Sequence, residues 1–308
     1  MYSIYTTTIK IVLLCYLMFH MSALYGQQHP QYTQYMYNTA ALNSGYSARG
    51  ILEASLLYRS QWVGIDGAPE TQSFSIQGRV KEKVAIGLTA INDNIGAADN
   101  LDVNGTFLYE IPTGYFTKLS LGVNAGVDVL KVDWSKASHQ NNLDPIFAEN
   151  INKVRPVFGA GVYFHSSNWY IGVSSHNFLN SEVYNDDELE VTDRKSQYYF
   201  MAGYVMNLSD NLKFKPAVLT KHVAGAPLTV DVSGNFLIRE TLALGLAYRY
   251  HDAASALAGL YISKSFFLGY SYDYSLTGLE NHNDGSHEII LKYNLFDARK
   301  RALSPRFF

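Results

Sequence analysis

The feature that most restricts this chain is an alternation of apolar and polar side chains, repeated from residue 51 to about residue 296. In residues 119–128, leucine, valine and alanine alternate with serine, glycine, asparagine and aspartate, and residues 228–233, 242–249 and 288–295 repeat the pattern. Successive side chains of a β-strand point to opposite faces, so a period of two indicates strands with one apolar and one polar face. No helical stripe of useful length follows residue 50. The sequence therefore predicts an all-β fold.

The alternating segments are similar in length, about ten residues each, and they number about 14. We expect strands at 51–59, 70–80, 83–92, 100–110, 115–131, 154–164, 168–176, 196–207, 211–221, 227–238, 241–250, 254–263, 265–274 and 286–296. A strand that crosses an outer membrane needs about 9–11 residues. A sheet in lipid must also close, because every backbone polar group has to be paired. The lengths predict one transmembrane barrel of about 14 antiparallel strands over residues 51–296.

The links between the expected strands differ in length according to their order. Links after even-numbered strands are short, at 81–82, 111–114, 165–167, 208–210, 239–240 and 264. Links after odd-numbered strands are mostly longer, at 60–69, 93–99, 132–153, 177–195, 222–226, 251–253 and 275–285, although 222–226 and 251–253 weaken the trend. Short turns at one end and long loops at the other are typical of bacterial outer-membrane barrels. This places the odd links outside the cell.

The two faces of the expected strands differ in chemistry. One face is rich in Leu, Val and Ile, and the other carries glycines and charged residues such as Glu53, Arg59, Glu288 and Lys292. We expect the apolar face to meet lipid and the charged face to line the lumen. The 24 tyrosines suit the aromatic girdles of membrane barrels. The alternative is a soluble sandwich or barrel with its apolar face turned inward.

The first 26 residues have the pattern of a secretory signal peptide. Lys10 precedes an apolar run that extends to about Leu24, and small residues follow, so cleavage is expected near Gly26. A single membrane anchor is the alternative. Cys15, the only cysteine, lies in this run, and the preceding Leu14 is too large for a lipoprotein cleavage site. The mature chain would then have no disulfide and no cysteine chemistry.

Two segments outside the expected strands could make other contacts. Residues 27–50 are rich in Gln, Tyr and Asn, and they carry no charge before Arg49. This pre-barrel segment could fold back into the lumen as a plug, dock a periplasmic partner, or form a poorly ordered leader. The basic tail at 297–308 should be periplasmic. The net charge of −3 gives no sign of nucleic-acid binding.

Three blocks of residues resemble one known family. They are Gln31-Tyr32, Gln34-Tyr35-Met36-Tyr37-Asn38, Leu42-Asn43 and Gly45-Tyr46; then Tyr58-Arg59, Gln61-Trp62, Gly64, Gly67-Ala68-Pro69 and Thr71; and finally Ser304-Pro305-Arg306-Phe307-Phe308. Together they are similar to the PorP/SprF family of Bacteroidetes outer-membrane proteins. One departure is Asn43-Ser44-Gly45, where the family usually carries Pro-Ala after its Asn.

The resemblance implies a barrel of the type IX secretion system, which helps export large surface proteins, including gliding adhesins, or keeps them at the cell surface. The implied partners are an adhesin-type cargo, periplasmic ring components of the secretion or gliding machinery, and outer-membrane lipid. Residues expected to bind partners are Gln34, Tyr35, Asn38, Asn43, Tyr46, Trp62, Gly64, Gly67, Pro69, Arg306, Phe307 and Phe308. A passive porin or small-solute transporter and a soluble secreted β-domain are the alternatives.

Catalytic and metal-binding residue types are present without a complete motif. His165-Ser166-Ser167, Ser174-Ser175-His176 and His251-Asp252 supply hydrolase residue types, but no Gly-x-Ser-x-Gly elbow accompanies them. Residues 92–96 and 281–285 offer oxygen ligands for calcium, yet neither has the twelve-residue spacing of an EF-hand. These residues are also ordinary turn formers. We therefore expect no enzyme activity, no metal and no cofactor.

Overall fold

The computed structural model describes residues 30–48, 50–136, 150–179 and 195–295. The expected signal peptide, its cleavage site and the tail at 297–308 lie outside the described residues. The strands are β1 (Leu52–Ser60), β2 (Glu70–Lys81), β3 (Val84–Ile95), β4 (Ala98–Pro112), β5 (Lys118–Val132), β6 (Ile151–His165), β7 (Trp169–Ser175), β8 (Gln197–Tyr204), β9 (Met206–Ser209), β10 (Leu212–Val223), β11 (Thr229–Ile238), β12 (Leu242–Arg249), β13 (Ala253–Tyr261), β14 (Phe266–Ser275) and β15 (Ser286–Leu295). The described residues also form two short helices, α2 (Thr39–Leu42) and η1 (Trp134–Lys136).

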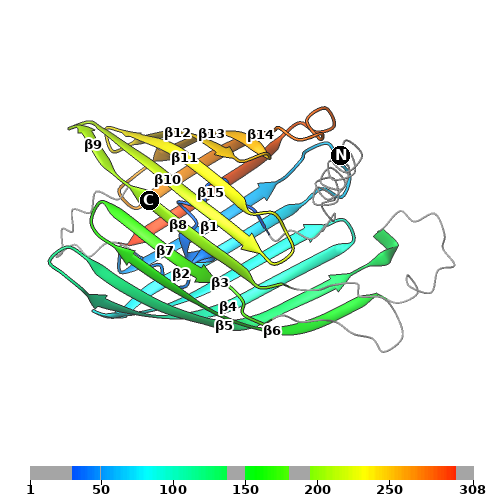
Figure 1. Ribbon diagram of the computed structural model, residues 1–308, viewed down its shortest axis with the longest axis horizontal. Coiled ribbons are helices and arrows are strands. Elements are labelled where there is room, and N and C mark those ends of the chain that lie inside the picture. Colours follow the sequence, from blue (N-terminus) through cyan, green and yellow to red (C-terminus); the bar gives the residue numbers. More distant parts are fainter. Residues whose placement is uncertain (1–29, 49, 137–149, 180–194, 296–308) are drawn as a thin grey trace, which may run out of the picture.

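The strands form one closed antiparallel barrel (Figure 1). Consecutive strands pair around the sheet, β15 pairs with β1, and β10 pairs with β11. β8 and β9 are two parts of one wall strand, because both pair with β10 and only Val205 separates them. The barrel therefore has 14 strands, which confirms the predicted fold class. Among the described residues, no helix is long and apolar enough to cross a bilayer.

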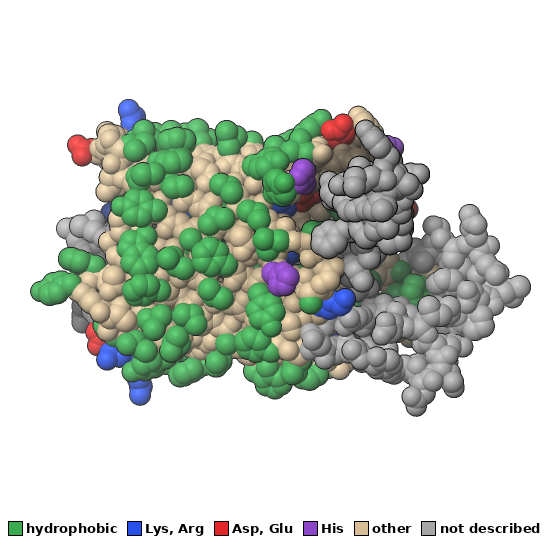
Figure 2. Space-filling model, viewed as in Figure 1, with side chains coloured by type: hydrophobic (Ala, Val, Ile, Leu, Met, Phe, Trp, Pro, Cys, Tyr) green, Lys and Arg blue, Asp and Glu red, His purple; other side chains and the backbone are tan. Residues whose placement is uncertain are grey.

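The side chains of the wall are sorted as the alternation predicted. Leu56 and Val123 are each 55% exposed on the outer face, whereas the side chains of Asp128 and Glu288 are fully buried in the lumen. Figure 2 shows apolar side chains spread over the wall, with charged side chains gathered near the two ends. The prediction of an outward apolar face is confirmed. The alternative with an apolar interior is wrong for this chain.

The link expected at 93–99 is shorter than predicted. β3 and β4 continue past the expected ends and are joined by residues 96–97 alone. Asp93 pairs with Asn100 and Asn94 with Asp99 in the ladder, although both faces are polar there. Beyond the hydrocarbon layer a strand needs no apolar face, so the loss of alternation does not end it. Elsewhere the predicted strands agree with the structure to within a few residues.

Both ends of the barrel sheet lie at the same end of the molecule. Leu52 at the start of β1 pairs with Leu295 at the end of β15. The short turns 82–83, 113–117 and 166–168 lie at that end, and the link 61–69 and the ends of β5 and β7 lie at the other. In outer-membrane barrels the short turns face the periplasm. We call the two ends periplasmic and outer accordingly.

Candidate functional site

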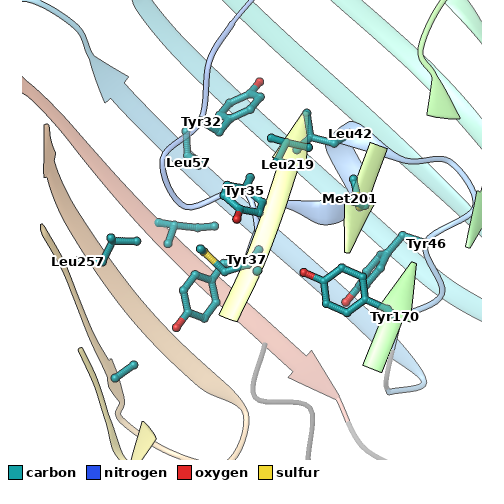
Figure 3. Packing of buried hydrophobic residues seen from close by; sticks show 14 of the residues in the cluster. Tyr32, Tyr35, Tyr37, Leu42, Tyr46, Leu57, Tyr170, Met201, Leu219 and Leu257 are labelled. Carbon is teal, nitrogen blue, oxygen red and sulfur yellow. The ribbon is translucent and has the colours of Figure 1, made fainter. Parts of the chain in front are cut away.

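The barrel lumen is occupied by residues 30–48, which we call the plug. Tyr35, Met36 and Asn38 are each at most 2% exposed. Figure 3 shows plug tyrosines among the inward side chains of the wall, including Leu57 and Met201. The buried apolar cluster thus joins the plug to the wall. This hydrophobic cluster lies at the centre of a lumen whose wall is otherwise mainly polar.

A buried ionic cluster near the outer end holds the first turn of the plug. Both carboxylate oxygens of Glu288 accept backbone N–H bonds, from Thr33 at 2.9 Å and from Gln34 at 2.7 Å. The Thr33 hydroxyl donates to Asp273 at 2.6 Å. Arg59 pairs with Asp273 at 2.8 Å and with Glu288 at 3.3 Å. Buried carboxylates persist only with compensating charges and hydrogen bonds, so the wall and the plug satisfy each other.

The middle of the plug lies against glycines of β5 and β6. A Cβ atom placed on Gly45 would lie 2.6 Å from the carbonyl oxygen of Gly161. A Cβ atom on Gly122 would overlap the carbonyl oxygen of Ser44. The Asn43 side chain accepts from the Gly45 N–H at 2.8 Å, which fixes the turn where the chain departs from the family pattern. Only residues without side chains permit this approach of plug and wall.

A second set of polar wall residues holds the periplasmic end of the plug. The Gln77 amide accepts from the Ala48 N–H at 2.6 Å and donates to the Tyr46 carbonyl at 2.8 Å. The Tyr46 hydroxyl donates to Glu53 at 3.2 Å. Lys292 pairs with the same Glu53 at 2.9 Å. The wall therefore holds the plug backbone at this end as well.

The plug extends from one end of the lumen to the other. Ala48 lies near the periplasmic start of β1, while Pro30 lies near the outer end, beside Asp93 and Asp102. A partly open pocket of about 40 Å³ lies between Pro30, Tyr32 and the wall. Such a volume holds no more than a few water molecules. The plug residues and the inward side chains around them are almost all buried, so the plug fills the described lumen.

The first outer loop, residues 61–69, is tied to both neighbouring loops. Val63 donates to the Gly285 carbonyl at 2.8 Å and accepts from the Asp284 N–H at 2.7 Å. On the other side, Gly96 donates to the Gly67 carbonyl at 2.9 Å. Gly64 and Gly67 have φ of 97° and 71°, a region that favours glycine, and Trp62 also has a positive φ of 49°. These bonds give the loop a fixed shape.

The predicted partner-binding residues fall in three places. Five of them lie in the lumen and contact the wall, namely Gln34, Tyr35, Asn38, Asn43 and Tyr46. Four lie in the first outer loop, namely Trp62, Gly64, Gly67 and Pro69, with Gly64 and Gly67 exposed and the other two half-buried. Arg306, Phe307 and Phe308 lie outside the described residues. The sequence analysis did not identify Gln77, which binds the plug backbone. Its position on the polar face of β2 was the one sequence feature that pointed to the lumen.

The hydrolase residue types do not assemble a nucleophile and an oriented base among the described residues. His165 meets Ser120 and Glu110 through the same ring atom, Nε2, at 3.5 Å each. A catalytic triad needs the acid on the opposite nitrogen from the serine. Ser174 instead donates to the Leu42 carbonyl of the plug at 2.7 Å. No group of three or more His, Cys, Asp or Glu residues in the described chain is placed to hold a metal ion.

Comparisons with known proteins agree with this architecture. The solved structure of the monoaromatic hydrocarbon channel CymD aligns with a TM-score of 0.52 at 10% identity, covering 86% of this chain and 94% of CymD. The toluene transporter TbuX of Ralstonia pickettii aligns at 0.48 with 8% identity, covering 85% and 93%. Omp33 of Acinetobacter baumannii aligns at 0.45 with 11% identity, covering 80% and 100%. At these identities, the similarity to CymD indicates the fold alone.

The family comparison is more specific. None of the curated proteins matches the sequence. The family profile described as type IX secretion system membrane protein PorP/SprF matches residues 24–293. This range contains the plug, the first outer loop and nearly all of the barrel. The chain is therefore an outer-membrane β-barrel and belongs to the PorP/SprF family of type IX secretion system membrane proteins.

Proposed function

We propose that this barrel helps export or anchor a large secreted surface protein of the adhesin type, and that it contacts periplasmic components of the secretion or gliding machinery. The observation that carries the proposal, beside the family, is the filled lumen. A barrel that acts as an anchor or a partner has no need of an open channel. A non-enzymatic role belongs to the same proposal.

A passive porin is the competing function, and the plug disfavours it. Diffusion of a solute would require the plug to leave contacts at both ends of the lumen. Glu288 holds two of its backbone N–H groups near the outer end, and Gln77 holds two backbone groups near the periplasmic end. These contacts would have to be broken together. In a planar bilayer we therefore expect the purified full chain to give no steady large conductance; a stable open pore would favour the porin.

On this proposal the outer surface that meets the cargo includes the first outer loop. Its backbone bonds to Gly285 and Gly67 hold it in one shape, which lowers the entropy lost when a partner binds. The five lumen residues would act indirectly, because they fix the plug rather than reach a partner. Gliding motility, the processing site near Gly26 and the role of the tail are further parts of the proposal.

The secretion role is tested by surface display. In the native organism we would delete the gene and measure, by antibody labelling of intact cells, the amount of the proposed adhesin-type cargo at the cell surface. Wild-type complementation should restore display. Display that is unchanged by the deletion would contradict a role in export or anchoring.

A further inference from the structure

At the periplasmic end of the barrel, one edge of strand β9 pairs with no other strand of the described residues. The pairing of β7 with β8 begins at Trp169 opposite Tyr204. The last backbone bond on that side runs from the Val205 N–H to the Asn168 carbonyl at 2.7 Å. The chain then continues as β9, which pairs with β10 alone among the described strands (Figure 1). The turn at 166–168 ends before it reaches β9, so no described strand pairs with the second edge of β9.

The free edge of β9 carries backbone groups that point away from the barrel sheet. In an antiparallel ladder, the N–H and C=O of alternate residues point to the same neighbour. Val205 bonds toward β7 and the register with β10 is regular from Met206 to Asn207, so the backbone groups of Asn207 point to the same side, where no described strand pairs. Both Asn207 and Leu208 are exposed, and Leu208 is 54% exposed on the outer face. The edge is therefore accessible.

A second overhanging edge, at the outer end, is protected in a way that β9 is not. β6 begins at Ile151, but its pairing with β7 begins only at Ala160. Phe158 bonds on the β7 side, donating to Asn177 at 3.2 Å, so Pro156 two residues earlier faces that side too. Proline has no N–H and blocks strand addition, a common protection of exposed edges. β9 carries Asn207, with its N–H intact, at the equivalent position.

We propose that the free edge of β9 binds an extended segment of a periplasmic protein as an added antiparallel strand. This inference rests on the proposed function, because it assumes an outer-membrane barrel with a partner in the periplasm. β9 has four residues, or about 13 Å of edge, and its register against β10 shifts between Asn207 and Ser209, so the edge suits only a short segment such as a chain terminus. The added strand would place apolar side chains beside Leu208 and polar ones beside Asn207.

A second copy of this chain does not fit the edge. Two copies in one membrane have the same orientation, so both β9 strands run toward the periplasm. Barrel strands tilt by roughly 35–45°, so a two-fold axis along the membrane normal would cross the two strands at roughly 70–90°. Antiparallel pairing needs them nearly aligned. A strand that rises from the periplasm meets this requirement.

The test is photo-crosslinking in native cells with the full chain. A photoreactive phenylalanine analogue replaces Leu208, and a control chain carries it at Ser263, which is exposed in another periplasmic turn. We expect an adduct with a periplasmic protein from position 208 and none from position 263. In the first background, Asn207→Pro should lower adduct yield about fivefold or more, the value of one hydrogen bond near 1 kcal/mol. Asn207→Ala keeps the N–H and should leave the yield unchanged.

The possible results separate the alternatives. Equal adduct from both positions, no adduct from position 208, or a yield insensitive to Asn207→Pro in a folded barrel would each overturn strand addition. An adduct within one chain, to residues 296–308, would overturn the partner and assign the edge to the chain's own tail. Folding of each variant is checked by resistance of the barrel to SDS at room temperature. If deletion of the gene leaves adhesin display unchanged but the adduct forms as expected, the edge is supported and only the secretion role fails.

Discussion

Glu288 should control how tightly the plug is docked. Its carboxylate accepts the N–H groups of Thr33 and Gln34, and its side chain is fully buried. In Glu288→Ala both N–H groups lose their partner when docked but regain water when undocked. Each unpaired buried N–H costs about 1–3 kcal/mol. The loss of the ion pair with Arg59 destabilises the barrel whether the plug is docked or undocked, so its effect on the docking free energy largely cancels. Docking should weaken by about 4 kcal/mol, or roughly a thousandfold.

The assay uses a single cysteine in place of Asn38, which is 1% exposed within the plug. The chain has only one natural cysteine, Cys15, in the expected signal peptide, so the label is specific. When closing is fast, the labelling rate of a protected thiol follows the population of the open state. Maleimide labelling of the folded barrel in detergent should therefore accelerate by roughly a thousandfold, and by at least about thirtyfold if the two bonds cost only about 2 kcal/mol.

A matched control separates docking from general loosening of the barrel. Glu280 is an exposed carboxylate of the last outer loop, and Glu280→Ala should leave the labelling rate at position 38 unchanged. Circular dichroism must show the same strand content in both variants. If Glu288→Ala labels at the parent rate, within about a factor of two, the two N–H bonds do not hold the plug and the reasoning above is refuted.

Three further substitutions probe other parts of the structure. Gly122→Ala places a methyl group where Ser44 lies and should lower the free energy of unfolding in urea by about 1–3 kcal/mol. Gly105→Ala, whose new Cβ atom would have its nearest neighbour at 3.8 Å, should leave the free energy of unfolding nearly unchanged. Equal losses in the two variants would contradict the tight contact between plug and wall. Leu246→Arg, at a 70% exposed outer position, should destabilise the barrel in bilayers by about 2–4 kcal/mol. Tyr115→Arg in a periplasmic turn should leave the stability unchanged. An unchanged stability of Leu246→Arg would mean that this face of the barrel meets water. Gly67→Ala forces a side chain into a positive φ, so we expect faster proteolysis of the first outer loop, and an unchanged rate would show that the loop tolerates the strain.

Much of the barrel was predictable because its signal is local. The alternation in 119–128 and 242–249 depends only on the two-residue period of a strand, and it correctly placed Val123 and Leu246 outside and Asp128 inside. Closure followed from the need to pair every backbone group in lipid. The prediction failed around Asp93 because β3 continues there with polar residues on both faces, so no alternation marks that part of the strand.

The position of the plug could not be predicted from any local sequence pattern. Residues 27–50 lack a strand or helix period, so a lumen position and a periplasmic one were both compatible with them. The sequence marked Arg59 and Glu288 as polar-face residues, but not as partners of the plug, because Thr33 and Glu288 are 255 residues apart. Which charges meet is decided only when β15 closes on β1.

The sequence by itself determined the class of the molecule. It indicated a barrel of strands with one apolar and one charged face, in a chain of the PorP/SprF family. The tertiary structure decided that the plug fills the described lumen, that the first outer loop is bonded to both neighbouring loops, and that β9 pairs with β10 alone among the described strands. The physical reason is that face alternation is encoded within a few neighbouring residues. Lumen contacts and unpaired edges depend on strand register and on the closure of the whole barrel.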